Sequence, residues 1–149
     1  MAQAQKQVRI IEPLERFVNR INLVGCYARV SSDSEDQLNS YNNQVDFYES
    51  YVNSLENSKL VKIYTDEGIT GTRMDKRDGF LQMIEDCRKG LINRIITKSI
   101  SRFARNITET LSVVRELKSI GVSVYFMTEK INTAKMGSEM MLAVYAACA

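Results

Sequence analysis

Short apolar runs alternate along this chain with longer stretches in which apolar residues recur at three- and four-residue steps. The short runs are typical of buried strands, and the longer stretches are typical of helices with one buried face. The strand-like runs lie at residues 23–28, 60–64, 94–97 and 122–127, and the helical patterns lie at residues 38–55, 80–87, 107–120 and 138–145. Strands that alternate with helices favour a parallel sheet. We therefore predict an α/β fold with a mostly parallel central sheet and helices on both faces.

A few residues mark where these elements begin and end. Gly90 and Gly121 each follow a helical pattern, and glycine commonly ends a helix because it adopts the left-handed conformation without a steric cost. Asn106 with Glu109 three residues later is typical of a capped helix start. Glycines and charged residues at 66–78 predict a long loop there.

The two ends of the chain differ in character. Residues 1–20 are polar and contain the only proline, so we predict an N-terminal arm before one domain at residues 21–149. Residues 130–137 predict a second loop, and Ser138 begins the last helical pattern. This pattern reaches the final residue without a glycine or a polar stop. We therefore expect the start of a long C-terminal helix, and a chain that is part of a longer protein.

No histidine occurs among the 149 residues. This excludes Ser-His-Asp and Cys-His catalysis, histidine-ligated metal sites and an imidazole general base. The three cysteines are widely spaced, which is typical of free thiols in a reducing compartment, so we expect a cytoplasmic protein. No apolar run approaches the roughly 18 residues of a membrane span, so we expect no membrane partner.

The net charge of +2 does not by itself indicate nucleic-acid binding. The charges are segregated, however. Residues 88–105 hold six cations and no carboxylate, whereas residues 33–56 hold carboxylates and no cation. This pattern fits either two solvated faces of opposite sign or a site for a polyanion near the basic segment.

Two segments place reactive side chains after predicted strands, where parallel sheets bind their ligands. Arg29 and Ser31 are two residues apart, which puts them on one side of an extended chain. Arg102 and Arg105 are three residues apart, which puts them on one face of a helical turn. Three guanidinium groups around one hydroxyl suit phosphoryl transfer. Alternatively, Ser31 caps a helix and the arginines form surface ion pairs.

The sequence lacks the common nucleotide-binding and hydrolase motifs. It contains no G-x-x-x-x-G-K-[ST] P-loop, no G-x-G-x-x-G fingerprint and no G-x-S-x-G elbow. We therefore expect no nucleotide cofactor.

Five motifs, in order, resemble those of the serine recombinases, the resolvase/invertase family. They are YARVSS at 27–32, QV at 44–45, IYTDEGITG at 63–71, RDGF at 77–80 and SRFARN at 101–106. The resemblance covers residues 22–149 and is to the N-terminal catalytic domain of this family. The SRFARN motif is similar to that of the large, transposon- or phage-type branch. It implies a resolvase-like fold whose DNA-specificity regions lie beyond Ala149.

The resemblance also implies roles for individual residues. Ser31 would attack a scissile DNA phosphate, forming a 5′-phosphoserine link and releasing a 3′-hydroxyl. Arg29, Arg102 and Arg105 would hold the phosphate and stabilise the transition state.

Four further residues would be accessory to the active site: Gln44, Arg77, Asp66 and Ser101, the last standing where many family members have Asp. Since one phosphodiester is exchanged for another, the resemblance implies no metal, no ATP and no other cofactor. The implied partners are double-stranded DNA at specific recombination sites and further copies of the chain, as a homodimer that assembles into a synaptic tetramer.

Two other interpretations remain open. One is a catalytically silent DNA- or phosphate-binding regulatory module of the same fold, and the other is a small-molecule phosphotransferase. The complete set of Ser31 and three arginines favours the recombinase, because a pure binding module would not need it. The lack of a nucleotide motif counts against the phosphotransferase.

Overall fold

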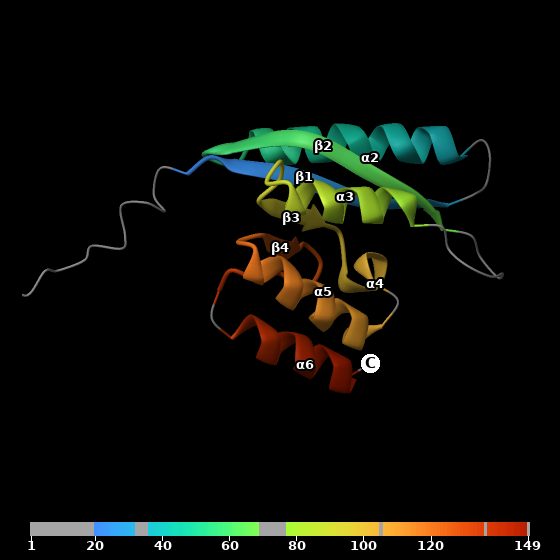
Figure 1. Cartoon of the computed structure of the whole chain (residues 1–149). Coiled ribbons are helices and arrows are strands. Elements are labelled where there is room, and N and C mark those ends of the chain that lie inside the picture. Colours follow the sequence, from blue (N-terminus) through green and yellow to red (C-terminus); the bar gives the residue numbers. More distant parts are fainter. Residues whose placement is uncertain (1–19, 32–35, 69–76, 105, 136, 149) are drawn as a thin grey trace, which may run out of the picture.

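The computed structural model describes residues 20–31, 36–68, 77–104, 106–135 and 137–148. These residues form a five-stranded sheet flanked by helices (Figure 1). The strands are β1 (Asn22–Ser31), β2 (Ser58–Gly68), β3 (Arg94–Thr97), β4 (Ser123–Phe126) and β5 (Ile131–Asn132). The helices are α2 (Asp36–Asn53), α3 (Asp78–Arg88), α4 (Ile100–Phe103), α5 (Ile107–Ser119) and α6 (Ser138–Cys148).

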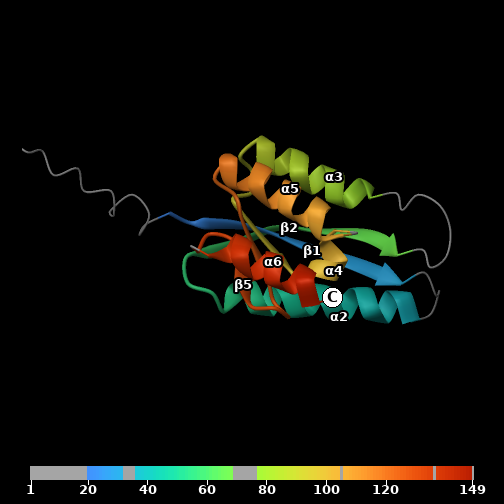
Figure 2. The ribbon, with the colours of Figure 1, turned by 90° about the horizontal axis from the view of Figure 1, so that it is seen from below.

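The sheet has the order β2-β1-β3-β4-β5. The first four of these strands run parallel, and β5 pairs antiparallel with β4. Helix α2 covers one face of the sheet, whereas α3 and α5 cover the other (Figure 2). The predicted mostly parallel α/β fold with helices on both faces is confirmed.

Strand β1 supplies side chains to both cores because successive residues of a strand point to opposite faces. Cys26 and Ala28 pack with Tyr48 of α2. Tyr27 packs instead with the cluster under α3 and α5, where its ring meets the edge of Phe80 at a centroid distance of 5.4 Å. Strand β1 is therefore buried on both faces of the sheet, and this packing holds its carboxyl end in place.

The predicted caps are confirmed. Gly90 and Gly121 have φ angles of 76° and 79°, the left-handed conformation that glycine adopts at the end of a helix. At the start of α5, the side chain of Asn106 accepts a hydrogen bond from the backbone N–H of Glu109 at 2.8 Å.

Three short elements differ from the sequence prediction. Residues 66–68 belong to β2 and not to a loop, because they continue the pairing with β1 as far as Ser31 opposite Gly68. Residues 131–132 form β5 within the second predicted loop. Helix α4 is a separate element of one turn after β3, where the sequence predicted only a helical turn around Arg102.

Helix α3 is tied to β2 by the hydroxyl of Tyr64, which donates to the carboxylate of Asp86 at 2.5 Å. This hydrogen bond lowers the pKa of Asp86 below its ordinary value. The carboxylate therefore adds stability above the pKa of an unfolded aspartate, and this contribution is lost as the pH falls through the folded pKa.

Tyr64→Phe is expected to lower the free energy of unfolding by about 1–2 kcal/mol at neutral pH. The difference in the free energy of unfolding between this variant and the original chain should narrow in acid. There Asp86 is protonated, and the hydrogen bond from Tyr64 no longer stabilises a charged carboxylate. Urea unfolding at neutral and at acidic pH measures the loss of stability under each condition. The exposed Tyr41→Phe serves as the control. A loss that does not change with pH would contradict the assignment.

Candidate active site at the carboxyl ends of the strands

A pocket of about 770 Å³ lies at the carboxyl ends of β1, β3 and β4. Arg29 lines it from β1, Lys98 from the residue after β3, and Arg102 from α4. Met127 and Thr128, which follow β4, complete this side of the pocket. Cations from two distant parts of the sequence, one at Arg29 and one at residues 98–102, thus meet at one edge of the sheet.

Helix α2 forms the opposite wall of the pocket. It contributes three small or amide side chains, Ser40, Asn43 and Gln44, and two aromatic ones, Phe47 and Tyr48. None of the described lining residues is acidic. The pocket therefore combines positive charge with neutral polar groups, which suits an anionic ligand such as a phosphate.

The position of the pocket follows from the order of the strands. Strand β1 lies between β2 and β3, and helix α2, which follows β1, lies on the opposite face of the sheet from α5, which comes after β3 (Figure 2). The connections leaving β1 and β3 therefore separate at this edge and leave a crevice, which is where open parallel sheets bind their ligands.

Arg102 is held close to β1 by its own hydrogen bond. Its guanidinium donates to the backbone carbonyl of Arg29 at 3.2 Å. Helix α4, which carries Arg102, is fixed in turn by Glu129, whose two carboxylate oxygens accept from the N–H of Ile100 at 3.2 and 3.3 Å. Lys98 is anchored through its carbonyl, which accepts from the N–H of Thr128 at 2.8 Å.

The structure brings together three of the predicted site residues: Arg29, Gln44 and Arg102. The amide of Gln44 donates to Ser40 one turn earlier in α2, at 3.3 Å. Ser31 is the last residue of β1, two positions beyond Arg29, and its backbone pairs with β2. The side chain of Ser31 and the whole of Arg105 lie outside the described residues, so their predicted roles stay predictions.

Ser101 is exposed and does not line the pocket. Its hydroxyl lies 3.1 Å from that of Ser99, within the same turn. Its contact is therefore local to α4, and the accessory role predicted for it stays a prediction.

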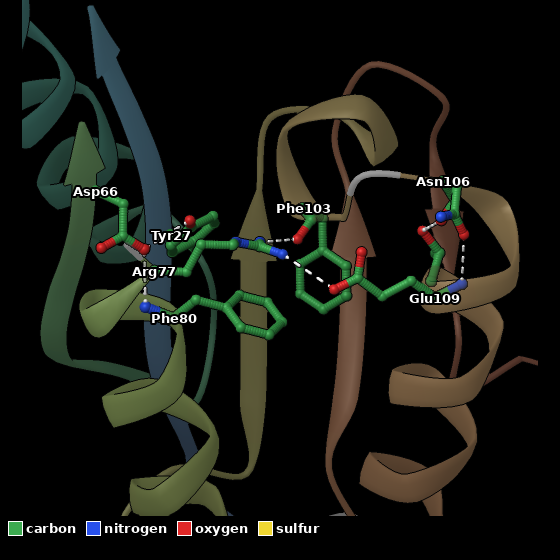
Figure 3. A network of polar contacts seen from close by, with 8 residues as sticks. Tyr27, Asp66, Arg77, Phe80, Phe103, Asn106 and Glu109 are labelled. Carbon is green, nitrogen blue, oxygen red and sulfur yellow. Dashed lines mark hydrogen bonds and ion pairs between the residues drawn. The ribbon is translucent and has the colours of Figure 1, made fainter. Parts of the chain in front are cut away.

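Asp66 lies beside the first turn of α3 and does not line the pocket (Figure 3). Its carboxylate accepts from the hydroxyl of Tyr27 at 2.8 Å, and from the backbone N–H groups of Gly79 and Phe80 at 2.8 and 2.9 Å. A Cβ at Gly79 would lie 2.4 Å from the carbonyl oxygen of Thr65, so only glycine fits this close approach. Asp66 thus serves as an N-terminal cap for α3 from a neighbouring strand.

Arg77 crosses from α3 to the segment that carries Arg102 (Figure 3). Its guanidinium lies 3.9 Å from the ring centroid of Phe80, donates to the carbonyl of Phe103 and pairs with Glu109 at 3.4 Å. The side chain is only 9% exposed and does not line the pocket. Arg77 therefore holds the residue next to Arg102 and connects α3, α4 and α5.

Burial affects the ionisation of two cysteines and two tyrosines in the core. It raises the pKa of Cys26 and of Cys87 to about 12, and both cysteines are free. Burial also raises the pKa of Tyr48 to about 12 and, together with the hydrogen bond to Asp66, that of Tyr27 to about 12. These groups are therefore protonated at neutral pH, and none of them supplies an anionic nucleophile.

A family described as "Resolvase, N terminal domain" matches residues 24–149. The chain belongs to this family. The transposon Tn552 resolvase of Staphylococcus aureus is 30% identical over 131 residues, which cover 83% of this chain and 56% of that protein. The chain thus spans just over half the length of this relative.

Solved structures show the same resolvase-like fold. The N-terminal catalytic domain of TP901-1 integrase has a TM-score of 0.65 and 22% identity, covering 85% of this chain and 93% of that one. A resolvase family site-specific recombinase from Streptococcus pneumoniae has a TM-score of 0.69 and 24% identity, covering 85% and 87%. At these identities the comparison supports the fold alone.

Among the residues that shape the pocket of this resolvase-family domain and were not predicted, three are instructive. Lys98 directly follows a predicted strand, so the rule that selected Arg29 could have found it. Phe47 lies three residues after Gln44 and hence on the same helix face. Glu129 reaches α4 from 29 residues away, and no local pattern in the sequence predicts such a contact.

None of the described helices has the length and apolar character needed to cross a membrane.

Proposed function

We propose that this chain is the catalytic domain of a serine site-specific recombinase, which cleaves and rejoins DNA through a 5′-phosphoserine intermediate on Ser31. The observation that carries the proposal is the pocket in which Arg29 and Arg102 meet at the carboxyl end of β1, the strand that ends at Ser31. Membership of the resolvase family supports DNA as the substrate of this arrangement.

In the proposed reaction, the Oγ of Ser31 attacks the scissile phosphorus and loses its proton. The bond from phosphorus to the 3′-oxygen breaks, and that oxygen leaves with a proton as a free 3′-hydroxyl. Arg29, Arg102 and Arg105 bind the non-bridging oxygens, where negative charge concentrates in the transition state. Rejoining reverses these steps with a different 3′-hydroxyl. Because one phosphodiester replaces another, the exchange requires no nucleotide cofactor, and in this proposal the arginines supply the positive charge that a metal would otherwise provide.

The proposed accessory residues differ in what they contact. Gln44 lines the pocket, which supports a direct contact with the DNA backbone. Arg77 acts as a positioning residue, since it binds the carbonyl of Phe103 beside Arg102. Asp66 holds the start of α3, immediately after Arg77.

The proposed partners are double-stranded DNA at specific recombination sites in the cytoplasm and further copies of the chain, as a homodimer that forms a synaptic tetramer. The outer surface of α6 supports self-association, because it exposes large apolar side chains that a partner would cover. These side chains are Met140, Met141, Val144 and Tyr145.

The test is to trap the covalent intermediate. The full-length protein is incubated with the DNA that flanks its own gene, and the reaction is stopped with denaturant. After nuclease and protease digestion, mass spectrometry is expected to find a nucleotide attached through phosphate to the peptide that contains Ser31. A sample that binds this DNA but yields no adduct would contradict the proposal and favour a catalytically silent binding module.

A further inference from the structure

We infer that the pocket holds a nucleobase as well as a phosphate, and that a base next to the scissile phosphate packs against the ring of Phe47. The inference rests on the proposed function, because it takes the cations of this pocket as the site of the reacting phosphate. It assigns Phe47 a DNA contact.

The ring of Phe47 lines the pocket and is 51% exposed. It is nevertheless held in place by its neighbours on α2. It stacks on Tyr51 with a centroid distance of 6.1 Å and an interplanar angle of 11°, and it meets Tyr48 edge-on at 5.7 Å. Tyr48 is itself buried and donates to the carbonyl of Tyr27 at 3.2 Å. Phe47 is therefore an ordered aromatic surface that opens into the pocket.

The composition of the pocket matches the two parts of a nucleotide. Arg29, Lys98 and Arg102 supply positive charge for phosphate oxygens, and Phe47 supplies a planar apolar surface. Proteins that bind unpaired nucleotides combine these same two features, since every base has a π-face that can stack on an aromatic ring. The exposed ring therefore offers a base a stacking surface that binding of a phosphate alone does not require.

The size of the pocket also exceeds what one phosphate requires. At about 770 Å³, it falls within the roughly 300–1,000 Å³ of pockets that enclose whole small-molecule ligands. The nucleotide beside the scissile phosphate supplies the base, which would leave the duplex stack when the DNA binds, as bases do in enzymes that extrude a nucleotide into a pocket. Recognition by stacking tolerates any base, so Phe47 would contribute affinity without sequence preference.

The first test measures DNA affinity of the full-length protein on cleavage-site DNA. Phe47→Ala is expected to weaken binding about 10-fold, within the range measured for loss of one base–aromatic stack. Phe47→Tyr should restore it. The matched control is Tyr41→Ala on the same helix, since Tyr41 is 40% exposed but does not line the pocket. Its affinity should equal that of the original protein.

The second test asks whether the lost contact is with a base. DNA with an abasic nucleotide beside the scissile phosphate should bind the original protein as weakly as Phe47→Ala binds intact DNA. Combining the two changes should cause no further loss, because both remove the same contact. Additive losses would overturn the inference. With 5-iododeoxyuridine at that nucleotide, irradiation should crosslink the DNA to the peptide that contains Phe47.

The outcomes separate this inference from the proposed function. If the original protein forms no adduct on Ser31, the proposed function fails. If it forms the adduct while Phe47→Ala binds and crosslinks DNA normally, only the inference on Phe47 fails. A Phe47→Ala protein that changes its self-association but not its DNA affinity would also overturn the inference, because the ring would then contact a second copy of the chain.

Discussion

Ser31→Ala is expected to lower the rate of DNA cleavage by at least about 10⁴-fold, since the variant lacks the attacking oxygen. Binding of the same DNA should change by no more than about twofold, because phosphate contacts from cationic side chains dominate affinity. Single-turnover cleavage by the full-length protein measures the first quantity, and a gel-shift titration measures the second.

The neighbouring serine provides a matched control for this variant. Ser32→Ala removes a hydroxyl from the same motif and should leave the cleavage rate near that of the original protein. No described cysteine substitutes for Ser31, because burial holds the thiols of Cys26 and Cys87 in the protonated form, with pKa values near 12. Cleavage that survives Ser31→Ala would place the nucleophile elsewhere and contradict the proposed mechanism.

The alternation of strand and helix patterns was sufficient to predict the parallel part of the fold. The elements it missed are too short to carry a period. Helix α4 has four residues and is held by Glu129 from 29 residues away, whereas β5 has two residues and pairs with the strand directly before it, β4. The end of β2 was missed for another reason. Asp66 and Gly68 have low strand propensity, but pairing with Arg29 and Ser31 of β1 satisfies their backbone and overrides that preference.

The functional site was also predicted only in part, because some of its contacts depend on segments that are distant in the sequence. Arg29 and Arg102 could be brought together from the sequence because both come after predicted strands, and parallel strands end at the same edge of a sheet. The sequence did not reveal that Arg77 points to the carbonyl of Phe103, or that Asp66 caps α3. Both contacts join segments 13 or more residues apart and depend on how the elements pack.

Asp66→Ala is expected to lower the free energy of unfolding of this domain by about 3 kcal/mol. The carboxylate is 8% exposed and accepts three hydrogen bonds, so its removal leaves the hydroxyl of Tyr27 and the N–H groups of Gly79 and Phe80 without that partner. Urea unfolding of the 149-residue chain measures the change. Tyr27→Phe removes a single donor and should cost only about 1 kcal/mol, because it leaves the helix cap in place.

Asp78→Ala is the matched control, because Asp78 lies in the first turn of the same helix but is exposed. It should lose less than about 1 kcal/mol, the usual size of a charge interaction with a helix terminus. An Asp66→Ala protein no less stable than Asp78→Ala would contradict the capping role. Because α3 begins directly after Arg77, loss of the cap should also loosen the contact between Arg77 and Phe103. Asp66→Ala should therefore reduce cleavage at temperatures where the domain is still folded, whereas Asp78→Ala should not.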